Sequence, residues 1–167
     1  MNIVYVDRDD KVIGSGSKVN AMSKGIIVRV SRVFLVNKQG ELLIQKRSAD
    51  SSLLNRWDQS AAGHVDEGED YKQAAARELN EEMGISGVKL AEAYRYYTEE
   101  ADETLVKKRQ NALFIGKYDG PVKPDPEEVS GYRWVKPAVL SKEMAEYPND
   151  FTEGFIRSFE VYQSLKT

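Results

Sequence analysis

Residues 63–69 read Gly-His-Val-Asp-Glu-Gly-Glu, and residues 77–85 read Arg-Glu-Leu-Asn-Glu-Glu-Met-Gly-Ile. The chain from Tyr71 to Met83 consists largely of strong helix formers, and it is followed by Gly84, a residue type that commonly ends helices. The sequence therefore predicts a loop that leads into a helix over residues 71–83.

Three carboxylates of this predicted helix fall on one face. At about 100° per residue, Glu78, Glu81 and Glu82 lie within one stripe of the helix surface. The neighbouring face carries three apolar residues that are expected to pack on the core, namely Ala76, Leu79 and Met83. Each like-charge pair at this spacing costs roughly 0.2–0.5 kcal/mol, and a divalent cation would reverse that cost. Oxygen ligands suit Mg²⁺ or Mn²⁺, and Mg²⁺ shares its coordination with substrate phosphates, so the stripe predicts a metal site that acts on a diphosphate. A solvated, Glu-rich surface helix is the alternative.

An arginine and a loop glutamate flank this stripe. Arg77 lies four residues before Glu81 and eight residues after Glu69, which allows charge-assisted hydrogen bonds that brace the carboxylates. Gly63 and Gly68 allow the loop backbone to turn tightly before the helix. These residues predict a loop that supports the acidic face.

The complete spacing resembles the Nudix box at every defined position, with a glycine, five residues, a glutamate, seven residues and then residues 77–85. Nudix proteins are typically Mg²⁺-dependent hydrolases of a diphosphate linked to another moiety, often a nucleoside diphosphate. The resemblance implies their α/β fold, an α/β/α sandwich with a mixed central sheet and a catalytic loop-helix-loop. It also implies metal binding by Gly63 (through its carbonyl), Glu78, Glu81 and Glu82, and a supporting salt bridge between Glu69 and Arg77.

A wider resemblance points to the isopentenyl-diphosphate-isomerase-like branch of this family. It rests on four segments, residues 9–14, 41–48, 57–65 and 151–155. Isomerases of that type use a cysteine just before the Gly-His pair and several histidines around the metal. This chain has Ala62 at that position and His64 as its single histidine. The resemblance therefore implies a hydrolase-type box on an isomerase-like scaffold.

A further metal carboxylate often comes from a loop outside the box in this family. Glu128 is the best match by position and Glu127 is its rival, while two solvated loop acids are the plain alternative. Glu82 and Glu128 are the candidates for accepting a proton from the attacking water, and Glu81 is counted with them as catalytic.

Two further residues are candidates for substrate binding. Arg47 ends a predicted strand, at a rim where loops commonly build ligand sites, and its guanidinium is suited to clamp phosphate oxygens, whereas Arg56 is expected to be solvated. His64, with an ordinary pKa near 6.5, either donates to a phosphate or packs against its neighbours. The basic triplet at residues 107–109 is expected to split across the two faces of a strand, so no continuous basic patch is predicted.

The rest of the chain predicts one domain over residues 1–167, with an N-terminal hairpin and loop over residues 1–25 and a core over 26–167. The hairpin is expected from residues 2–7 and 11–13, with a loop at the Gly/Ser cluster 14–17, and a second hairpin from 26–36 and 41–45. Further strands are expected at 88–98, 104–118 and 129–135, and two helices from Pro137 and from about Thr152.

The amino-acid composition excludes several classes of function. The 167 residues include 24 Lys plus Arg, 27 Asp plus Glu and 41% hydrophobic residues, which suits one domain with a sizeable core. A net charge of −3 argues against nucleic acid as a partner, and the absence of cysteine excludes disulfides and a thiolate nucleophile. The first residues do not form a signal peptide and no stretch reaches membrane-spanning length, so a cytoplasmic protein without a membrane partner is expected. The N-terminal hairpin suggests a homodimer.

Three functions are consistent with these patterns. The first is Mg²⁺-dependent (or Mn²⁺-dependent) hydrolysis of a small diphosphate-containing substrate, a nucleoside diphosphate linked to another moiety. The second is isomerisation of isopentenyl diphosphate on the same metal site, and the third is a non-catalytic sensor that binds a nucleotide.

Overall fold

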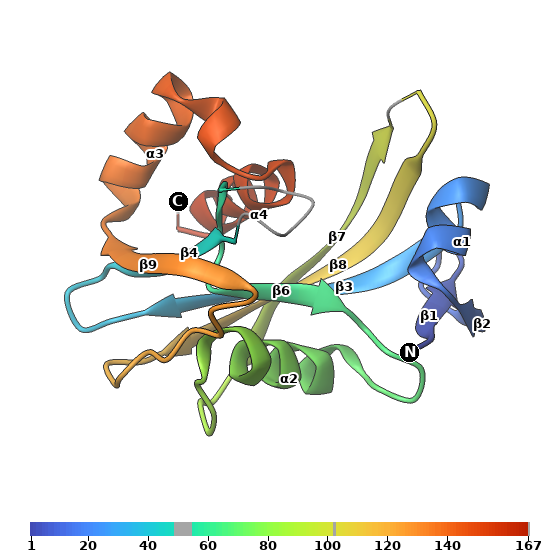
Figure 1. The fold of residues 1–167 in the computed structure, drawn as a ribbon, viewed down its shortest axis with the longest axis horizontal. Helices are drawn as coiled ribbons and strands as arrows, with labels where there is room; N and C mark the ends of the chain where they lie inside the picture. Colours follow the sequence, from blue (N-terminus) through green and yellow to red (C-terminus); the bar gives the residue numbers. More distant parts are fainter. Residues whose placement is uncertain (49–54, 102, 167) are drawn as a thin grey trace.

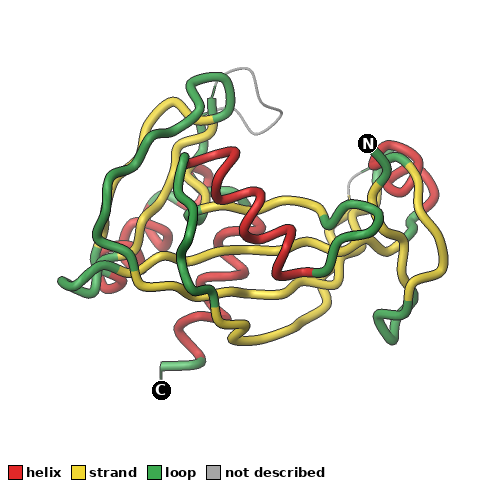
Figure 2. The backbone as a smooth tube through the Cα atoms, turned by 90° about the horizontal axis from the view of Figure 1, so that it is seen from below, coloured by secondary structure: helices red, strands yellow, loops and turns green. Residues whose placement is uncertain are grey.

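The computed structural model describes residues 1–48, 55–101 and 103–166. Its strands form one mixed sheet with helices on both faces, as expected for an α/β/α sandwich. Figure 1 shows α2 (Tyr71–Met83) below the sheet and α3 (Pro137–Glu146) and α4 (Glu153–Ser164) above it. Figure 2, seen from below, shows a helix crossing the strands on the near face.

Strand β3 (Ile27–Val36) is the centre of the sheet. The other strands are β1 (Ile3–Val6), β2 (Val12–Gly16), β4 (Leu42–Arg47), β5 (Trp57–Asp58), β6 (Ala61–His64), β7 (Ala91–Ala101), β8 (Val106–Lys117) and β9 (Val129–Val135). β3 pairs in parallel with β8 along its whole length, and antiparallel with β6 and with β1. β8 pairs in turn with β7, while β4 pairs with β5 and β9.

The predicted hairpin between β3 and β4 is present only beside its turn. Val36 pairs with Leu42, and the two strands then diverge. The physical reason is competition for the edge of β3, because β6 pairs with Val30–Val33. The turn was therefore visible in the sequence, but the partners of the two strands were not.

Two apolar cores lie on the two faces of the sheet. Leu35 of β3 packs with Leu79 and Met83 on the α2 side, whereas its neighbour Phe34 packs edge to face on Phe155 of α4. Burying each of these side chains contributes roughly 1.5–3 kcal/mol. The expectation that Ala76 faces the core is wrong, because Ala76 is exposed and Ala74 and Ala75 are buried in its place.

Helix α2 has the predicted bounds. Asp70 and Gln73 form a capping box at its start, and Gly84 ends it in the left-handed conformation, with φ of 64°. A Cβ at Gly84 would lie 2.5 Å from the carbonyl oxygen of Lys123, so a glycine is required there for two reasons. Both ends of the helix that carries the acidic stripe are thus fixed.

The N-terminal hairpin of β1 and β2 is confirmed, but the loop expected after it is wrong. Residues Gly14 to Gly16 belong to β2, and Lys18–Lys24 form a helix, α1. Ser17 caps this helix by accepting a hydrogen bond from the amide of Asn20, and Gly25 ends it with φ of 66°. Ser17 and Gly25 are the sequence signals that predict a short helix here.

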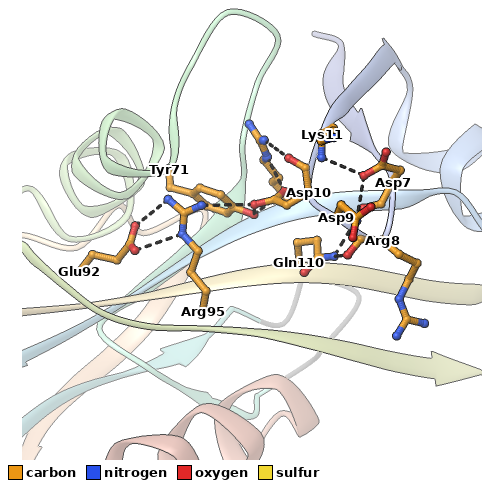
Figure 3. A network of polar contacts seen from close by, with 10 residues as sticks. Asp7, Arg8, Asp9, Asp10, Lys11, Tyr71, Glu92, Arg95 and Gln110 are labelled. Atoms are coloured by element: carbon orange, nitrogen blue, oxygen red, sulfur yellow. Dashed lines mark hydrogen bonds and ion pairs between the residues drawn. The ribbon is translucent and has the colours of Figure 1, made fainter.

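The tip of this hairpin is held against the core through Asp10, which has a φ of 63° (Figure 3). Its carboxylate accepts hydrogen bonds from Arg29 Nε at 2.8 Å and from the hydroxyl of Tyr71, the first residue of α2, at 2.9 Å. Arg95 Nη1 lies 3.4 Å from the same carboxylate and also pairs with Glu92. The hairpin is therefore connected directly to the start of α2.

The C-terminal elements follow the sequence closely. The expected strands 88–98, 104–118 and 129–135 correspond to β7, β8 and β9, and the helices expected from Pro137 and Thr152 correspond to α3 and α4. A short 3-10 turn, η1 (Pro148–Asp150), joins the two helices. Within the described residues, no helix has the length and apolar character needed to span a membrane.

Candidate active site

The acidic stripe of α2 runs from the protein interior to solvent. Glu82 is 5% exposed, while the side chains of Glu78 and Glu81 are 15% and 58% exposed. Glu82 Oε1 accepts hydrogen bonds from Gln45 Nε2 at 3.0 Å and from the amide of Ala62 at 3.2 Å. The stripe therefore presents its buried end toward β4 and β6.

Arg77 connects the loop to the stripe. Its Nε and Nη2 donate to the two carboxylate oxygens of Glu69 at 2.8 and 2.9 Å, a bidentate pair. Its Nη1 lies 2.7 Å from Glu78 Oε1 and 3.4 Å from Glu81 Oε2, and its Nη2 donates to the carbonyl of His64. The structure thus brings together Arg77 and Glu69 as the sequence predicts. It also places the carboxylates of Glu78 and Glu81 beside the guanidinium of Arg77.

Gly63 leaves room for the carboxylate of Glu78. A Cβ at this position would lie 2.2 Å from Glu78 Oε1, so any side chain would displace that group. As the side chains stand, no three His, Cys, Asp or Glu groups within residues 1–48, 55–101 and 103–166 are gathered closely enough to hold a metal ion. The donor chemistry nevertheless fits a hard divalent cation, because the stripe and the Gly63 backbone offer only oxygen ligands.

A cavity of about 530 Å³ opens above this stripe, between α1, β3, β6, the start of β8 and the start of α4. Glu82, Gly63 and Asp58 line it, so it begins at the buried end of the stripe. Four carboxylates line it (Asp58, Glu82, Glu100 and Glu153), against seven cationic side chains (Lys18, Arg32, Arg47, Arg56, Lys107, Lys108 and Arg109). A chain with a net charge of −3 therefore encloses a cavity with an excess of positive charge.

The cavity has two ends with different charges acting on them. Burial raises the pKa of Glu82 well above its usual range, and the carboxylates of Glu78 and Asp58 raise it further. Burial likewise raises the pKa of Glu78 to about 6. We call Gly63, Glu82, Asp58 and Arg47, which line the cavity, together with Glu78, which does not, the acidic end.

Positive rather than negative charges surround the imidazole of His64. Burial, together with four cations, Arg109, Lys18, Arg32 and Lys107, lowers its pKa to about 3, so the imidazole is neutral near pH 7. A neutral imidazole offers one donor and one acceptor to a ligand in the cavity. We call the four residues Lys18, Arg32, Lys107 and Arg109 the cationic end.

The expectation for the basic triplet at residues 107–109 is wrong. All three side chains line the cavity, although they alternate along β8. The triplet stands at the very start of β8, beside α1, and Lys108 reaches toward Gly25, where a Cβ would lie 3.7 Å from its Nζ. A strand end that is flanked by a helix can therefore direct consecutive residues to one space.

A family model for the NUDIX domain matches residues 27–155, more than half of the chain. The chain belongs to the Nudix family. An uncharacterised Nudix hydrolase of Pseudomonas aeruginosa is 33% identical over 147 residues, covering 87% of this chain and 85% of that protein. The isopentenyl-diphosphate Delta-isomerase of Streptomyces coelicolor is 37% identical over 145 residues, covering 84% and 74% of the two chains. The chain is thus a Nudix hydrolase similar to the isomerase-like branch, and the general chemistry of its family is diphosphate hydrolysis.

Solved structures agree on the Nudix fold. DR0079 from Deinococcus radiodurans matches with a TM-score of 0.75 and 25% identity, covering 88% of this chain and 90% of that one. A binary complex of an Ap4A hydrolase from C. elegans matches with a TM-score of 0.58 over 82% and 98% of the two chains, and at 23% identity this likeness concerns the fold alone.

The predicted substrate-binding residues both line the cavity of this Nudix hydrolase. Arg47 lies at the acidic end, with its Nη1 3.5 Å from Asp58 Oδ2, and His64 lies between the two ends. Arg56, expected to be solvated, lines the cavity too. Glu128 and Glu127 are exposed, line no part of the cavity, and make no side-chain hydrogen bond or ion pair with any described residue. A metal-binding or catalytic role for Glu128 stays a prediction.

Sequence reasoning did not identify several charged residues of the cavity, among them Asp58, Arg32 and Arg109. Asp58 is 5% exposed, and its Oδ1 accepts hydrogen bonds from the amide of Gln59 and the hydroxyl of Thr152. Arg32 and Arg109 come from β3 and β8, far apart in the sequence. One signal was available, because Arg32 continues the face of β3 that carries Val28 and Val30, where a charge is unusual.

Proposed function

We propose that this Nudix hydrolase cleaves a small diphosphate-containing substrate, a nucleoside diphosphate linked to another moiety, with Mg²⁺ or Mn²⁺ as cofactor. The observation that carries the proposal is the position of Glu82 and Gly63 in the wall of a cavity where cationic side chains outnumber carboxylates. A cavity of about 530 Å³ is of the size that small-molecule sites commonly have. A substrate held there needs no extended nucleic-acid groove.

Glu78, Glu81 and Glu82, with the carbonyl of Gly63, would hold the cation. Two observations support this assignment, namely the space that Gly63 leaves beside Glu78 and the burial of Glu82 next to a second carboxylate. A divalent cation bound there neutralises diphosphate charge and lowers the pKa of water. Arg77, held bidentately by Glu69, positions the carboxylates without touching the substrate.

The chain's own groups supply the remaining roles. Glu82 is the best placed of the three predicted catalytic carboxylates to accept a proton from the attacking water, because it alone lines the cavity, while Glu81 and Glu128 are exposed. Arg47 is positioned to bind phosphate oxygens at the acidic end. His64, neutral in this field, donates one hydrogen bond to the substrate.

The isomerase alternative needs a proton donor where this chain has Ala62. Ala62 lines the cavity, its methyl side chain carries no acidic proton, and its amide is already bonded to Glu82. Isomerisation moves a double bond by adding one proton and removing another, so this chain lacks a donor at that position.

A product assay tests the proposal. The protein is incubated with Mg²⁺ and a panel of nucleotide sugars, ADP-ribose, NADH, nucleoside triphosphates and isopentenyl diphosphate, and products are separated by chromatography. Cleavage of a diphosphate linkage by the wild-type protein, lost in Glu82→Gln, is the expected result. Conversion of isopentenyl to dimethylallyl diphosphate would favour the isomerase, and nucleotide binding without turnover would favour the sensor.

A further inference from the structure

The buried arginine of β3 leaves most of its hydrogen-bond donors without a partner among the described residues. Arg32 is 5% exposed, and its Nε donates to Asn111 Oδ1 at 2.9 Å. Its two terminal nitrogens have neither a hydrogen bond nor an ion pair with any residue that the structure describes. They lie beside the first turn of α4, where a Cβ at Gly154 would be 2.6 Å from Nη1, and the side chain lines the cavity.

A second guanidinium enters the same space from β8. The side chain of Arg109 is 16% exposed, and its one ion pair within the described residues is with Glu100 at 3.4 Å. Burial lowers the pKa of Arg109, and the nearby charge of Arg32 lowers it further. Two mostly buried guanidiniums therefore repel each other in the protein as it stands.

Two lysines add to this excess. Lys18, from the first turn of α1, and Lys107 line the same part of the cavity, and neither has an ion pair within the described residues. Removing the guanidiniums of Arg32 and Arg109 from water is costly, and the like charges of the half-buried Lys107 and the exposed Lys18 increase that cost. An arrangement of this kind persists at functional sites, where a ligand of opposite charge offsets it.

We propose that the cationic end, Lys18, Arg32, Lys107 and Arg109, binds a second anionic group of the substrate, a phosphate monoester remote from the diphosphate that is cleaved. The proposal rests on the proposed function for the position of that diphosphate at the acidic end. A phosphate monoester carries a charge of about −1.5 to −2 near pH 7, and guanidiniums bind its oxygens through paired hydrogen bonds.

The rest of the cavity suits a substrate with two anionic groups. Arg47 and the carboxylates that would hold the cation serve the acidic end, so the scissile diphosphate does not need the four cations of the other end. Apolar side chains, including Met22, Val28, Val30 and Leu105, line the same cavity and would contact the organic part of the substrate. A purely apolar tail would instead leave Arg32 and Arg109 without an anion.

Matched pairs of substrates test this proposal. NADPH differs from NADH, and coenzyme A from dephospho-coenzyme A, by one phosphate monoester, while each contains a diphosphate. With Mg²⁺, the wild-type protein is expected to prefer the phosphorylated member of at least one pair by tenfold or more in kcat/KM. Arg109→Gln is expected to lower kcat/KM further for that member than for its partner, so that the preference falls at least fivefold.

The control is Arg157→Gln, because this substitution removes the same charge from an exposed position of α4. It is expected to keep the wild-type preference, and Lys107→Gln provides a second cavity variant if Arg109→Gln folds poorly. A preference near one in the wild type for both pairs would overturn the proposal. An unchanged preference in both folded cavity variants would also overturn it, since the cations would then serve the scissile diphosphate.

A binding measurement separates this proposal from the proposed function. Binding of each pair member is measured calorimetrically in excess chelator, so that no metal-dependent turnover occurs. Tenfold tighter binding of a phosphorylated member, lost in Arg109→Gln, supports the second anion site even if no panel compound is hydrolysed. Equal binding, or no binding of either pair, overturns it, and hydrolysis of unphosphorylated diphosphates would leave the proposed function standing alone.

Discussion

The two ends of the cavity are built in different ways. The loop and helix from Gly63 to Glu82 supply most of the acidic end, and within this segment Arg77 pairs with Glu69, Glu78 and Glu81. The cationic end combines α1, β3 and β8, and its charges are largely uncompensated. A compact motif thus carries the chemistry, while the sheet assembles the groups that select the substrate.

This difference predicts how substitutions act. Changes at the acidic end should lower turnover of every substrate together, because they affect the step that all substrates share. Changes at the cationic end should alter the preference between substrates. Substitutions at each end of the cavity test that separation.

The largest effect is expected from Glu82→Gln. The change keeps the shape of a buried side chain and one acceptor oxygen for Gln45 and Ala62, but it removes the charge. Metal electrostatics contributes several kcal/mol to catalysis, so kcat should fall roughly a hundredfold to a thousandfold. The fall should be equal for NADH and NADPH, and a chelator should have the same effect on the wild type.

The thermal midpoint provides the control for this variant. Because burial already disfavours the charged form of Glu82, the variant is expected to unfold at the wild-type temperature or above it. A rate within threefold of the wild type would remove Glu82 from the site. A changed ratio of the two substrates would contradict the separation of the two ends.

The next effect is expected from Gly63→Ala. The added Cβ would lie 2.2 Å from Glu78 Oε1, so Glu78 must move. A displacement of about 1 Å in a catalytic group can lower the rate roughly a hundredfold, and overpacking costs about 1–3 kcal/mol of stability. Gly14→Ala is the matched control, since a Cβ there meets nothing within 4 Å. Equal rates for the two variants would show that Glu78 does not act from its observed position.

A smaller effect is expected from Arg77→Lys. Lysine keeps the charge but cannot form the bidentate pair with Glu69. Groups that orient metal ligands typically change activity by about tenfold to a hundredfold, so kcat/KM should fall in this range with the substrate ratio unchanged. Arg157→Lys alters an exposed pair with Glu160 and should leave both rate and stability near the wild type. A loss confined to stability would assign Arg77 to the fold alone.

The same contrast explains what the sequence could predict. The bounds of α2 followed from helix formers and Gly84, which act within one segment. Arg32 and Arg109 meet because β8 lies parallel to β3 with Val28 opposite Arg109, a register set by the packing of distant segments. No local spacing encodes that register. The missed helix α1 lies between these two cases. Its caps, Ser17 and Gly25, were visible in the sequence, but the helix between them has only seven residues and therefore gives a weak periodic pattern.

The N-terminal hairpin is connected to both α2 and α1 and provides the last prediction. Its tip holds Tyr71 at the start of α2 through Asp10, and the helix that follows it carries Lys18 to the cationic end. Asp10→Asn keeps a side chain that tolerates the left-handed backbone and removes the charge that Arg29 and Arg95 contact.

Three donors would then share a neutral acceptor, and the side chain of Asp10 is 18% exposed, so water offsets part of the loss. A decrease of about 1 kcal/mol in the free energy of unfolding is expected, measured by denaturant titration. Asp9→Asn, at an exposed neighbour in the same turn, should leave the stability within experimental error. Because Asp10 lines neither end of the cavity, the ratio of NADPH to NADH turnover should stay constant in Asp10→Asn. A change in that ratio would mean that the hairpin sets the position of Lys18 independently of α2, and the cationic end would then extend to the hairpin tip.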